Sequence, residues 1–577
     1  MCDAENPLAH TETFPFPDLV GTEFAGSMLS EDHGFGFYNN DFDNLMDIPD
    51  NDVLMLCNSD DDPGGSSPGR TMDLVYHLED TGSQTKPDIF ALVSDTDKFT
   101  RYKSITQGTQ GSSQTCWPTK LAARRYIRAY FGSFQKHIPL LHVPTYLAHQ
   151  CSEPLQLAIY AIGALHVYNE TEARRLYRAG HEAFLAQKLL LVPVERLQTL
   201  LLLTMFGSLS DDDDLREEIL PLQSQLAEEL HNIPKDVVSS ESSSWDVWVQ
   251  RETLKRTILN IVCFLGVMNV ASLSSSIFLP PSFDIEFPYS ETLFLCNREE
   301  EWEYLFSSAP KPQTFKIAFH NLTSLSGPVL QIDSGLGNLV LMLALYTHVR
   351  SCKTVSASLP ILLGREIIET STLSLKRWLS SLGGPGVACQ NEQTGADCSL
   401  TASALILWKV ATIQLYADFA SVTEIQDAIL ALSTGQHHTI SALHTIQIPT
   451  HTAEAMGHAV SFVHGPVVRG VQFLKATACA DICIYHGLMG FHCLVLLVRW
   501  LSSLESASKA TGDQCTHPDA LLLLQNIREL VGESDQPSME SLPLSAACAK
   551  IWVEILKSDR QIWGVRKLLC TYLDKLI

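Results

Sequence analysis

Four consecutive aspartates, Asp211 to Asp214, precede Leu215-Arg216-Glu217 and form an acidic group whose spacing could support chemistry. Within this group, Asp213, Asp214 and Glu217 would lie about one turn apart on a helix. Carboxylates in that pattern can hold magnesium ions that bind a diphosphate. The same residues could simply cap the next helix, because the helix dipole favours negative charge at its N-terminus. The second motif of the metal chemistry, Asn-Asp…Ser…Glu on a later helix, is missing, which favours the capping loop.

A second group contains soft metal ligands: Cys479, Cys483 and His486 at i, i+4 and i+7, with Cys493 two turns further on. A single helix face with this spacing could hold a metal ion. Its apolar neighbours favour a packed core helix instead. Elsewhere the sequence contains no phosphate-binding loop and no nucleophile elbow. We therefore assign no catalytic, cofactor-binding or metal-binding residue, and we predict that the chain is not an enzyme.

The N-terminal segment is strongly acidic. No lysine or arginine occurs before Arg70, and the first 69 residues carry fifteen Asp and Glu. Mutual repulsion keeps such a segment solvated and leaves its apolar side chains available to a partner. We predict that an activation segment docks these side chains on the transcription machinery or on co-activators. Its partner-binding residues are Phe42, Leu45, Met46, Leu54 and Leu56. The alternative is a solvated acidic tail without a partner.

The charge of the remaining chain argues against a broad nucleic-acid surface. The formal charge of the 577 residues is −25, of which the first 69 residues contribute −15 and the remainder −10. Affinity for nucleic acid rests largely on Lys and Arg contacts to phosphates, and the basic spot at Arg124, Arg125 and Arg128 is small. The 15 cysteines are scattered and no secretory signal is evident, so a reducing compartment is expected.

Helical periodicity begins near Pro118. Ile127, Tyr130, Phe131 and Phe134 share one helical face. Further helices are expected over 153–168, 172–189 and 194–209, the last with Pro193 as its start, and from Trp245 onward. The apolar stretch 258–273 is too short and too interrupted for a membrane span and predicts a buried helix. Segments 383–399, 505–518 and 533–541 are expected to be loops. No strand pattern is found, so we predict an all-α fold: a disordered acidic tail (1–117), a first helical part (118–310), and a remaining helical body (311–577) packed against it.

Several short motifs follow one another along this body. The first comprises Tyr130-Phe131, Phe134, Pro139, His142, Pro144, Thr145 and Tyr146, and the second runs from Pro154 to Leu165. The third comprises Trp245, Trp248, Arg251, Glu252, Lys255 and Arg256, followed by Pro280, Pro281, Glu291 and Trp302. His486, Phe491, Trp500, Trp552, Trp563, Gly564 and Tyr572 lie near the C-terminus. Together they resemble the fungal-specific transcription-factor regulatory (middle homology) region over about 118–577. The last set resembles the subgroup with two-Cys/two-His zinc fingers.

The resemblance implies a nuclear regulator of a metabolic pathway, often of one secondary-metabolite biosynthetic gene cluster. Members of the family normally carry a zinc-dependent DNA-binding module ahead of this region. Before Trp117 this sequence has only Cys2, Cys57 and Cys116, none in finger spacing with a histidine pair. We therefore expect DNA contact only through a partner or through a zinc-finger module missing here. No membrane association is expected, and dimerisation is left open. The alternatives are a helical enzyme, such as a magnesium-dependent terpene cyclase, and a finger-less co-regulator.

Overall fold

The computed structural model describes thirteen stretches of the chain. They are 117–232, 244–271, 285–324, 327, 331–356, 359–382, 396–416, 453–481, 483–511, 518–534, 539, 541–558 and 562–577. Over these residues the fold is all-α, as predicted, and the only β contact there is an isolated bridge between Glu286 and Thr314. The activation-segment residues Phe42, Leu45, Met46, Leu54 and Leu56 lie outside the described residues.

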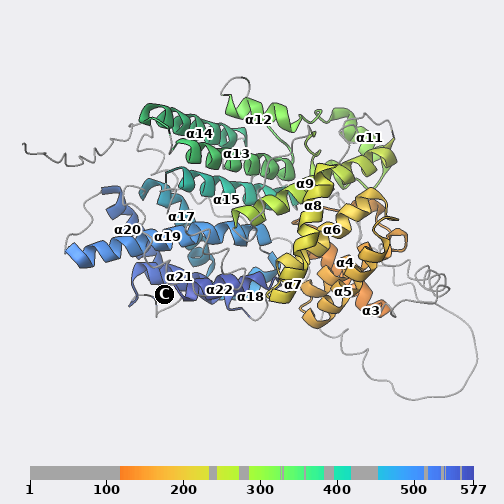
Figure 1. The fold of residues 1–577 in the computed structure, drawn as a ribbon, viewed down its shortest axis with the longest axis horizontal. Coiled ribbons are helices and arrows are strands. Elements are labelled where there is room, and N and C mark those ends of the chain that lie inside the picture. Colours follow the sequence, from red (N-terminus) through yellow and green to blue (C-terminus); the bar gives the residue numbers. More distant parts are fainter. Residues whose placement is uncertain are drawn as a thin grey trace, which may run out of the picture. The chain divides into compact units, whose positions relative to one another are not determined.

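The first helices pack around α4 (Figure 1). They are α3 (Lys120–Ala129), the π-helix η3 (Tyr130–Phe134), the 3-10 turns η4 (Val143–Thr145) and η5 (Ala148–Gln150), α4 (Glu153–His166), α5 (Glu170–Gln187) and α6 (Pro193–Ser208). The Thr119 side chain caps α3 and the Asn169 side chain caps α5, while Pro193 begins α6 as predicted. The predicted apolar face at Ile127 to Phe134 is fully buried, although its second half is a π-turn rather than an α-helix.

Close helix packing explains one glycine of the second motif. Gly163 lies where α4 crosses α3, and an added Cβ there would stand 2.0 Å from the backbone oxygen of Tyr126. Any larger residue would therefore force the two helices apart. Glycine at this position sets the distance between them.

The bend within the first motif is buried, so its carbonyl groups need internal donors. Side-chain amides supply them: Gln135 Nε2 donates to Leu141 O at 2.7 Å, and Gln198 Nε2 donates to Leu140 O at 3.2 Å. From α9, Asn260 Nδ2 donates to Pro139 O at 3.2 Å. The proline-enforced bend is thus held by amides from three separate elements.

The middle of the chain consists of α7 (Asp213–Glu218), α8 (Leu220–His231), α9 (Trp245–Val270), α10 (Glu291–Phe294), α11 (Glu299–Ser308) and α12 (Phe315–Thr323). By length and composition, α9 and α19 (Ile484–Thr511) are the two described helices that could cross a membrane. Their most apolar windows are 78% and 89% buried within the protein, which is the environment of core helices. The buried helix predicted over 258–273 is confirmed as far as Val270, where α9 ends, and residues 272–273 lie outside the described residues.

The later helices pack mainly in the order α13 on α14 and α15, α15 on α19, and α19 on α17 and α21 (Figure 1). They comprise α13 (Gly335–Ser356), α14 (Ile361–Ser381), α15 (Ala396–Tyr416), α17 (Ala453–Arg469), α18 (Val471–Asp481), α20 (Pro518–Gly532), α21 (Leu544–Leu556) and α22 (Val565–Asp574). Contacts between α13 and α9 join this group to the preceding helices.

Two predicted loops contain helix. Residues 396–399 begin α15, and residues 505–511 complete α19. In the second case a tertiary contact opposes the loop interpretation: Glu505 accepts hydrogen bonds from Ser545 N at 3.1 Å and from Ser545 Oγ at 2.6 Å. The Ser- and Ala-rich sequence there looked like a linker, yet the last turns of α19 hold the start of α21.

Candidate functional site

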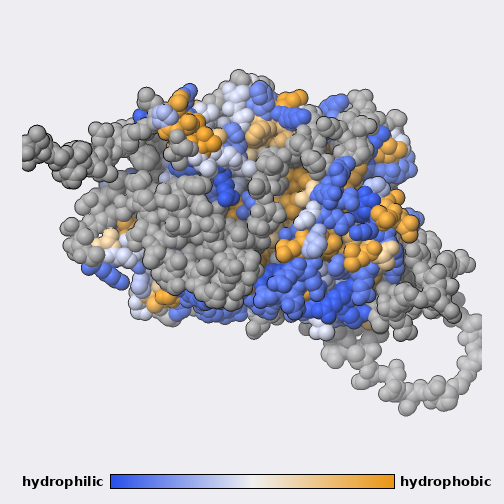
Figure 2. Space-filling view, viewed as in Figure 1, coloured by the Kyte–Doolittle hydropathy of each residue, from blue (hydrophilic) through white to orange (hydrophobic). Residues whose placement is uncertain are grey.

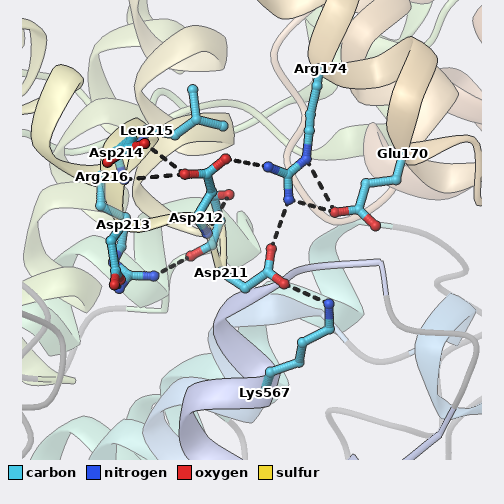
Figure 3. A network of polar contacts seen from close by, with 10 residues as sticks. Glu170, Arg174, Asp211, Asp212, Asp213, Asp214, Leu215, Arg216 and Lys567 are labelled. Carbon is cyan, nitrogen blue, oxygen red and sulfur yellow. Dashed lines mark hydrogen bonds and ion pairs between the residues drawn. The ribbon is translucent and has the colours of Figure 1, made fainter. Parts of the chain in front are cut away.

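The acidic loop, residues 211–214, follows α6 and includes the first two residues of α7, and it faces basic side chains from two other helices (Figure 3). Arg174 on α5 contacts Asp211 at 3.0 Å and also pairs with Asp212. The same guanidinium pairs with Glu170, one turn earlier on α5, at 2.6 Å. Lys567 on α22 lies 2.5 Å from the second Asp211 oxygen. The loop therefore lies at the centre of an ion-pair network made by three segments that are far apart in the sequence.

The next two aspartates act on the start of α7. Asp212 is its N-cap, and Asp212 Oδ1 accepts hydrogen bonds from Asp214 N at 3.1 Å and Leu215 N at 3.4 Å. Asp213 pairs with Arg216 one turn later. Capping satisfies backbone donors that a helix leaves open at its start. This geometry favours the capping interpretation of the motif over the magnesium interpretation.

The charge balance at Asp211 shows how the loop is held. Burial raises the pKa of the Asp211 carboxyl, but hydrogen bonds and charge interactions, chiefly with Lys567, and also Arg174, outweigh burial, so the pKa is lowered overall. The carboxylate is ionised, and its two oxygens are engaged by cations of the protein. Within the described ranges no group of three or more His, Cys, Asp or Glu side chains is arranged to hold a metal ion. Figure 2 shows hydrophilic side chains over the face that carries α5 and α7.

Backbone packing places α22 against the same loop. Val565 N donates to Leu209 O at 2.8 Å, across the end of α6. Gly564 lies so close that an added Cβ would stand 2.3 Å from Asp211 N. The motif glycine is therefore needed for a close backbone approach. Asp211 and Gly564 both belong to motifs of the sequence, but the sequence contains no signal that the two residues meet.

The third motif forms a buried ion cluster. Glu252 pairs with Lys255 at 2.8 Å and with Arg256 at 3.1 Å, and Arg256 also pairs with Glu291 at 2.8 Å. The Tyr289 backbone completes the cluster, since its N–H donates to Glu252 at 3.1 Å and its carbonyl accepts from Arg256 at 2.8 Å. Buried charges require such complete pairing. The motif residues thus join α9 to the segment before α10.

Aromatic rings cover this ion cluster. The Arg256 guanidinium lies 3.9 Å from the centroid of the Phe294 ring. The His142 ring packs edge-on against the same Phe294 ring at a centroid distance of 4.9 Å. Trp248 and Trp302 pack at 5.6 Å in the neighbouring hydrophobic group. The first and third motifs, more than a hundred residues apart, therefore meet at one place.

A histidine junction links the first motif to the C-terminal helices. His137 Nδ1 lies 2.7 Å from Ser399 Oγ, and His486 Nε2 lies 2.9 Å from Ser399 O, so His486 carries its proton on Nε2. The His166 ring packs edge-on against Phe134 and Trp563. Burial lowers the pKa of His486 to about 4, although its hydrogen bond to Ser399 opposes the shift. The junction is a neutral, packed contact.

The expectation that Cys479, Cys483 and His486 share one helix face is wrong, because such a face needs one continuous helix. The helix breaks between Asp481 at the end of α18 and Ile484 at the start of α19. Cys483 and Cys493 are buried, and burial raises the pKa of Cys483 to about 11. The side chain of Cys479 lies outside the described residues. A thiol with a raised pKa is a poor metal ligand at neutral pH, which agrees with the packed-core interpretation.

Comparison with known families identifies two successive matches. Residues 127–346 match the fungal specific transcription factor domain, and residues 425–575 match the fungal transcription factor C-terminal domain. Together these matches cover more than half of the chain and include the first and third motifs and the C-terminal set. No curated protein and no solved structure is significantly similar to the chain. The acidic loop lies within the first match, and Lys567 lies within the second.

Proposed function

Since this chain belongs to the fungal-specific transcription factors and is a transcriptional regulator, we propose that it controls a metabolic pathway, in particular a secondary-metabolite biosynthetic gene cluster. The observation that carries the proposal is the ordered pair of family matches. The C-terminal motif residues, which resemble those of the zinc-finger subgroup, support the narrower assignment. The family domains imply that the protein acts in the nucleus.

The test of this assignment is a comparison of transcripts. Deleting the gene should change the expression of a compact group of neighbouring biosynthetic genes, and overexpression should change the same group in the opposite direction. A strain that carries the Gly564→Ala chain should show the deletion effect in weaker form, because a crowded Gly564–Asp211 contact weakens the folded body. Unchanged transcripts in the deletion strain across conditions that induce such clusters would contradict the proposed target class.

Activation is proposed to come from the acidic segment. Negative charge keeps apolar side chains solvated there, and a partner groove can bind them. Residues 1–80 fused to an unrelated DNA-binding domain should activate a reporter. Alanine at Phe42, Leu45, Met46, Leu54 and Leu56 should abolish that activity at unchanged charge.

A matched control distinguishes this segment from apolar content in general. Alanine at five apolar residues nearer the N-terminus should leave most of the activity intact; these are Leu8, Phe14, Phe16, Leu19 and Phe24. Equal loss in both variants would show that no particular segment docks. Full activity of the first variant would exclude hydrophobic docking.

Contact with DNA is proposed to come from a partner or from a zinc-finger module outside this sequence. Specific DNA binding needs an element that enters a groove together with cations that neutralise phosphates. The purified chain should therefore enrich no site from random DNA at physiological salt. Recovery of one strong motif by the chain alone would overturn this part of the proposal.

A further inference from the structure

Arg499 is a buried arginine on α19. Only 3% of its surface is exposed, and its Nε and Nη2 atoms have no hydrogen-bond partner. Among the residues that the structure describes, no carboxylate forms an ion pair with it. The nearest acidic residue along α19 is Glu505, whose two oxygens are engaged by Ser545. The guanidinium therefore lacks the counter-charge that a buried cation normally has.

A second donor lies beside this guanidinium. The Tyr572 side chain on α22 is 1% exposed, and its hydroxyl has no hydrogen-bond partner other than the Arg499 guanidinium. Burial lowers the pKa of Arg499, and a charge interaction and a hydrogen bond with the Tyr572 side chain oppose that shift. The Tyr572 ring packs on Phe491, a residue of α19, at a centroid distance of 5.5 Å. The guanidinium and the hydroxyl thus lie together between α19 and α22, and no carboxylate of the described residues pairs with them.

Arg256 shows what a satisfied buried arginine looks like in the same protein. It is 1% exposed, and it pairs with Glu252 and Glu291 and donates to the Tyr289 carbonyl. Arg499 is almost equally buried but has neither carboxylate. An arginine stays protonated at any physiological pH, and an uncompensated buried charge is strongly unfavourable. The difference between the two arginines points to a ligand that supplies the missing negative charge.

We propose that Arg499 and Tyr572 form a binding site for the oxyanion of a small molecule, a carboxylate or a phosphate. A guanidinium presents a planar fork of donors that matches two oxygens of either group. The Tyr572 hydroxyl adds a third donor beside that fork. The site is independent of which genes the protein controls, because binding to it is measured on the purified chain.

The test measures thermal unfolding of the full chain at constant ionic strength, with sodium chloride replaced stepwise by sodium acetate or by sodium phosphate. A bound anion stabilises the folded state in a saturable way. The midpoint temperature of the wild-type chain should rise and saturate with one of the two anions, which identifies the head group. The saturable rise should be absent in Arg499→Met. In Tyr572→Phe the anion's Kd should increase about tenfold, because one hydrogen bond to a charged group is lost.

The variants also give opposite results without any anion. Arg499→Met should unfold at the same temperature as the wild-type chain or higher, because it removes an uncompensated buried charge. Arg256→Met should unfold at a lower temperature, because it removes the one cation that pairs with both Glu252 and Glu291. The proposal is overturned if Arg499→Met is destabilised as Arg256→Met is, or fails to fold. It is equally overturned if neither anion produces a rise that Arg499→Met lacks.

Discussion

Lys567 Nζ lies 2.5 Å from Asp211 Oδ2, although the two residues are 356 positions apart in the sequence. One belongs to the last helix and the other to the acidic loop after α6. The ion pair itself is partly exposed, with 56% of the lysine side chain in solvent, so its own contribution is at most about 1 kcal/mol. The close approach of Gly564 to the backbone of Asp211 restricts the sequence more, because it leaves no room for a side chain at position 564.

Gly564→Ala should therefore destabilise the protein by about 1–3 kcal/mol, because the new methyl group would overlap the Asp211 backbone. Gly457→Ala is the matched control. Gly457 is an exposed helical glycine with nothing within 4 Å of an added Cβ, so alanine there should be neutral or stabilising by up to about 1 kcal/mol. Denaturant unfolding of both variants measures the difference. Equal stability of the two would show that the loop moves aside at no cost.

Substitutions in the acidic loop should show that one aspartate is needed for stability and that the others tolerate replacement. Asp212→Ala removes the cap of α7 and should cost about 1 kcal/mol in the free energy of unfolding. Asp213→Asn, Asp214→Asn and Glu217→Gln together should change stability by only about 0.5 kcal/mol, since these residues are on the exposed side of the turn. Calorimetry should detect no tight magnesium binding. Product formation from a prenyl diphosphate that disappears with Asp213→Asn would instead establish the enzyme.

Glu252→Ala should be among the most damaging single changes in the described body. It leaves Lys255 and Arg256 buried with one carboxylate removed, and breaking a buried pair in this way costs about 3–5 kcal/mol. Glu369→Ala is the control, because Glu369 forms an exposed i,i+4 pair with Arg365 and should cost about 0.5 kcal/mol or less. Thermal unfolding compares the two. A small effect of Glu252→Ala would mean that water reaches the cluster.

Acid should begin to destabilise the protein at pH values well above those at which carboxylates titrate. Burial lowers the pKa of His142, His458, His486 and His492 to about 4 and that of His166 to about 3, from an ordinary value of 6.5. The folded state keeps these rings neutral, whereas the unfolded chain binds protons below pH 6.5. The contribution of these histidines to the free energy of unfolding is therefore complete above pH 6.5. It falls as the pH decreases towards 4, by about 1.4 kcal/mol per pH unit for each histidine.

His166→Phe tests this pH dependence at one site. Both ring nitrogens of His166 lack hydrogen-bond partners, and Lys136 and Arg566 further lower its pKa, so phenylalanine should be tolerated at pH 7. The decline in stability between pH 6.5 and 4 should become shallower by about 1.4 kcal/mol per unit. An identical slope in His166→Phe would place the acid sensitivity elsewhere.

Local pattern alone determined the all-α class, the start of α6 at Pro193 and the burial of the apolar face of α9. The order of the aromatic and charged motifs along the chain was sufficient to identify the family. These properties follow from side-chain periodicity and helix capping, which involve residues only a few positions apart and can therefore be read from the local sequence. The capping role of the acidic loop could be predicted for the same reason.

Tertiary structure decided what depends on residues far apart in the chain. The sequence could not reveal that Asp211 pairs with Lys567, that Glu505 extends α19 by holding Ser545, or that a helix break separates Cys479 from Cys483. It also could not distinguish Arg256, which is paired, from Arg499, which has no carboxylate among the described residues. Each of these depends on which helix packs against which. That choice is made by the burial of whole surfaces, and no short-range pattern encodes it.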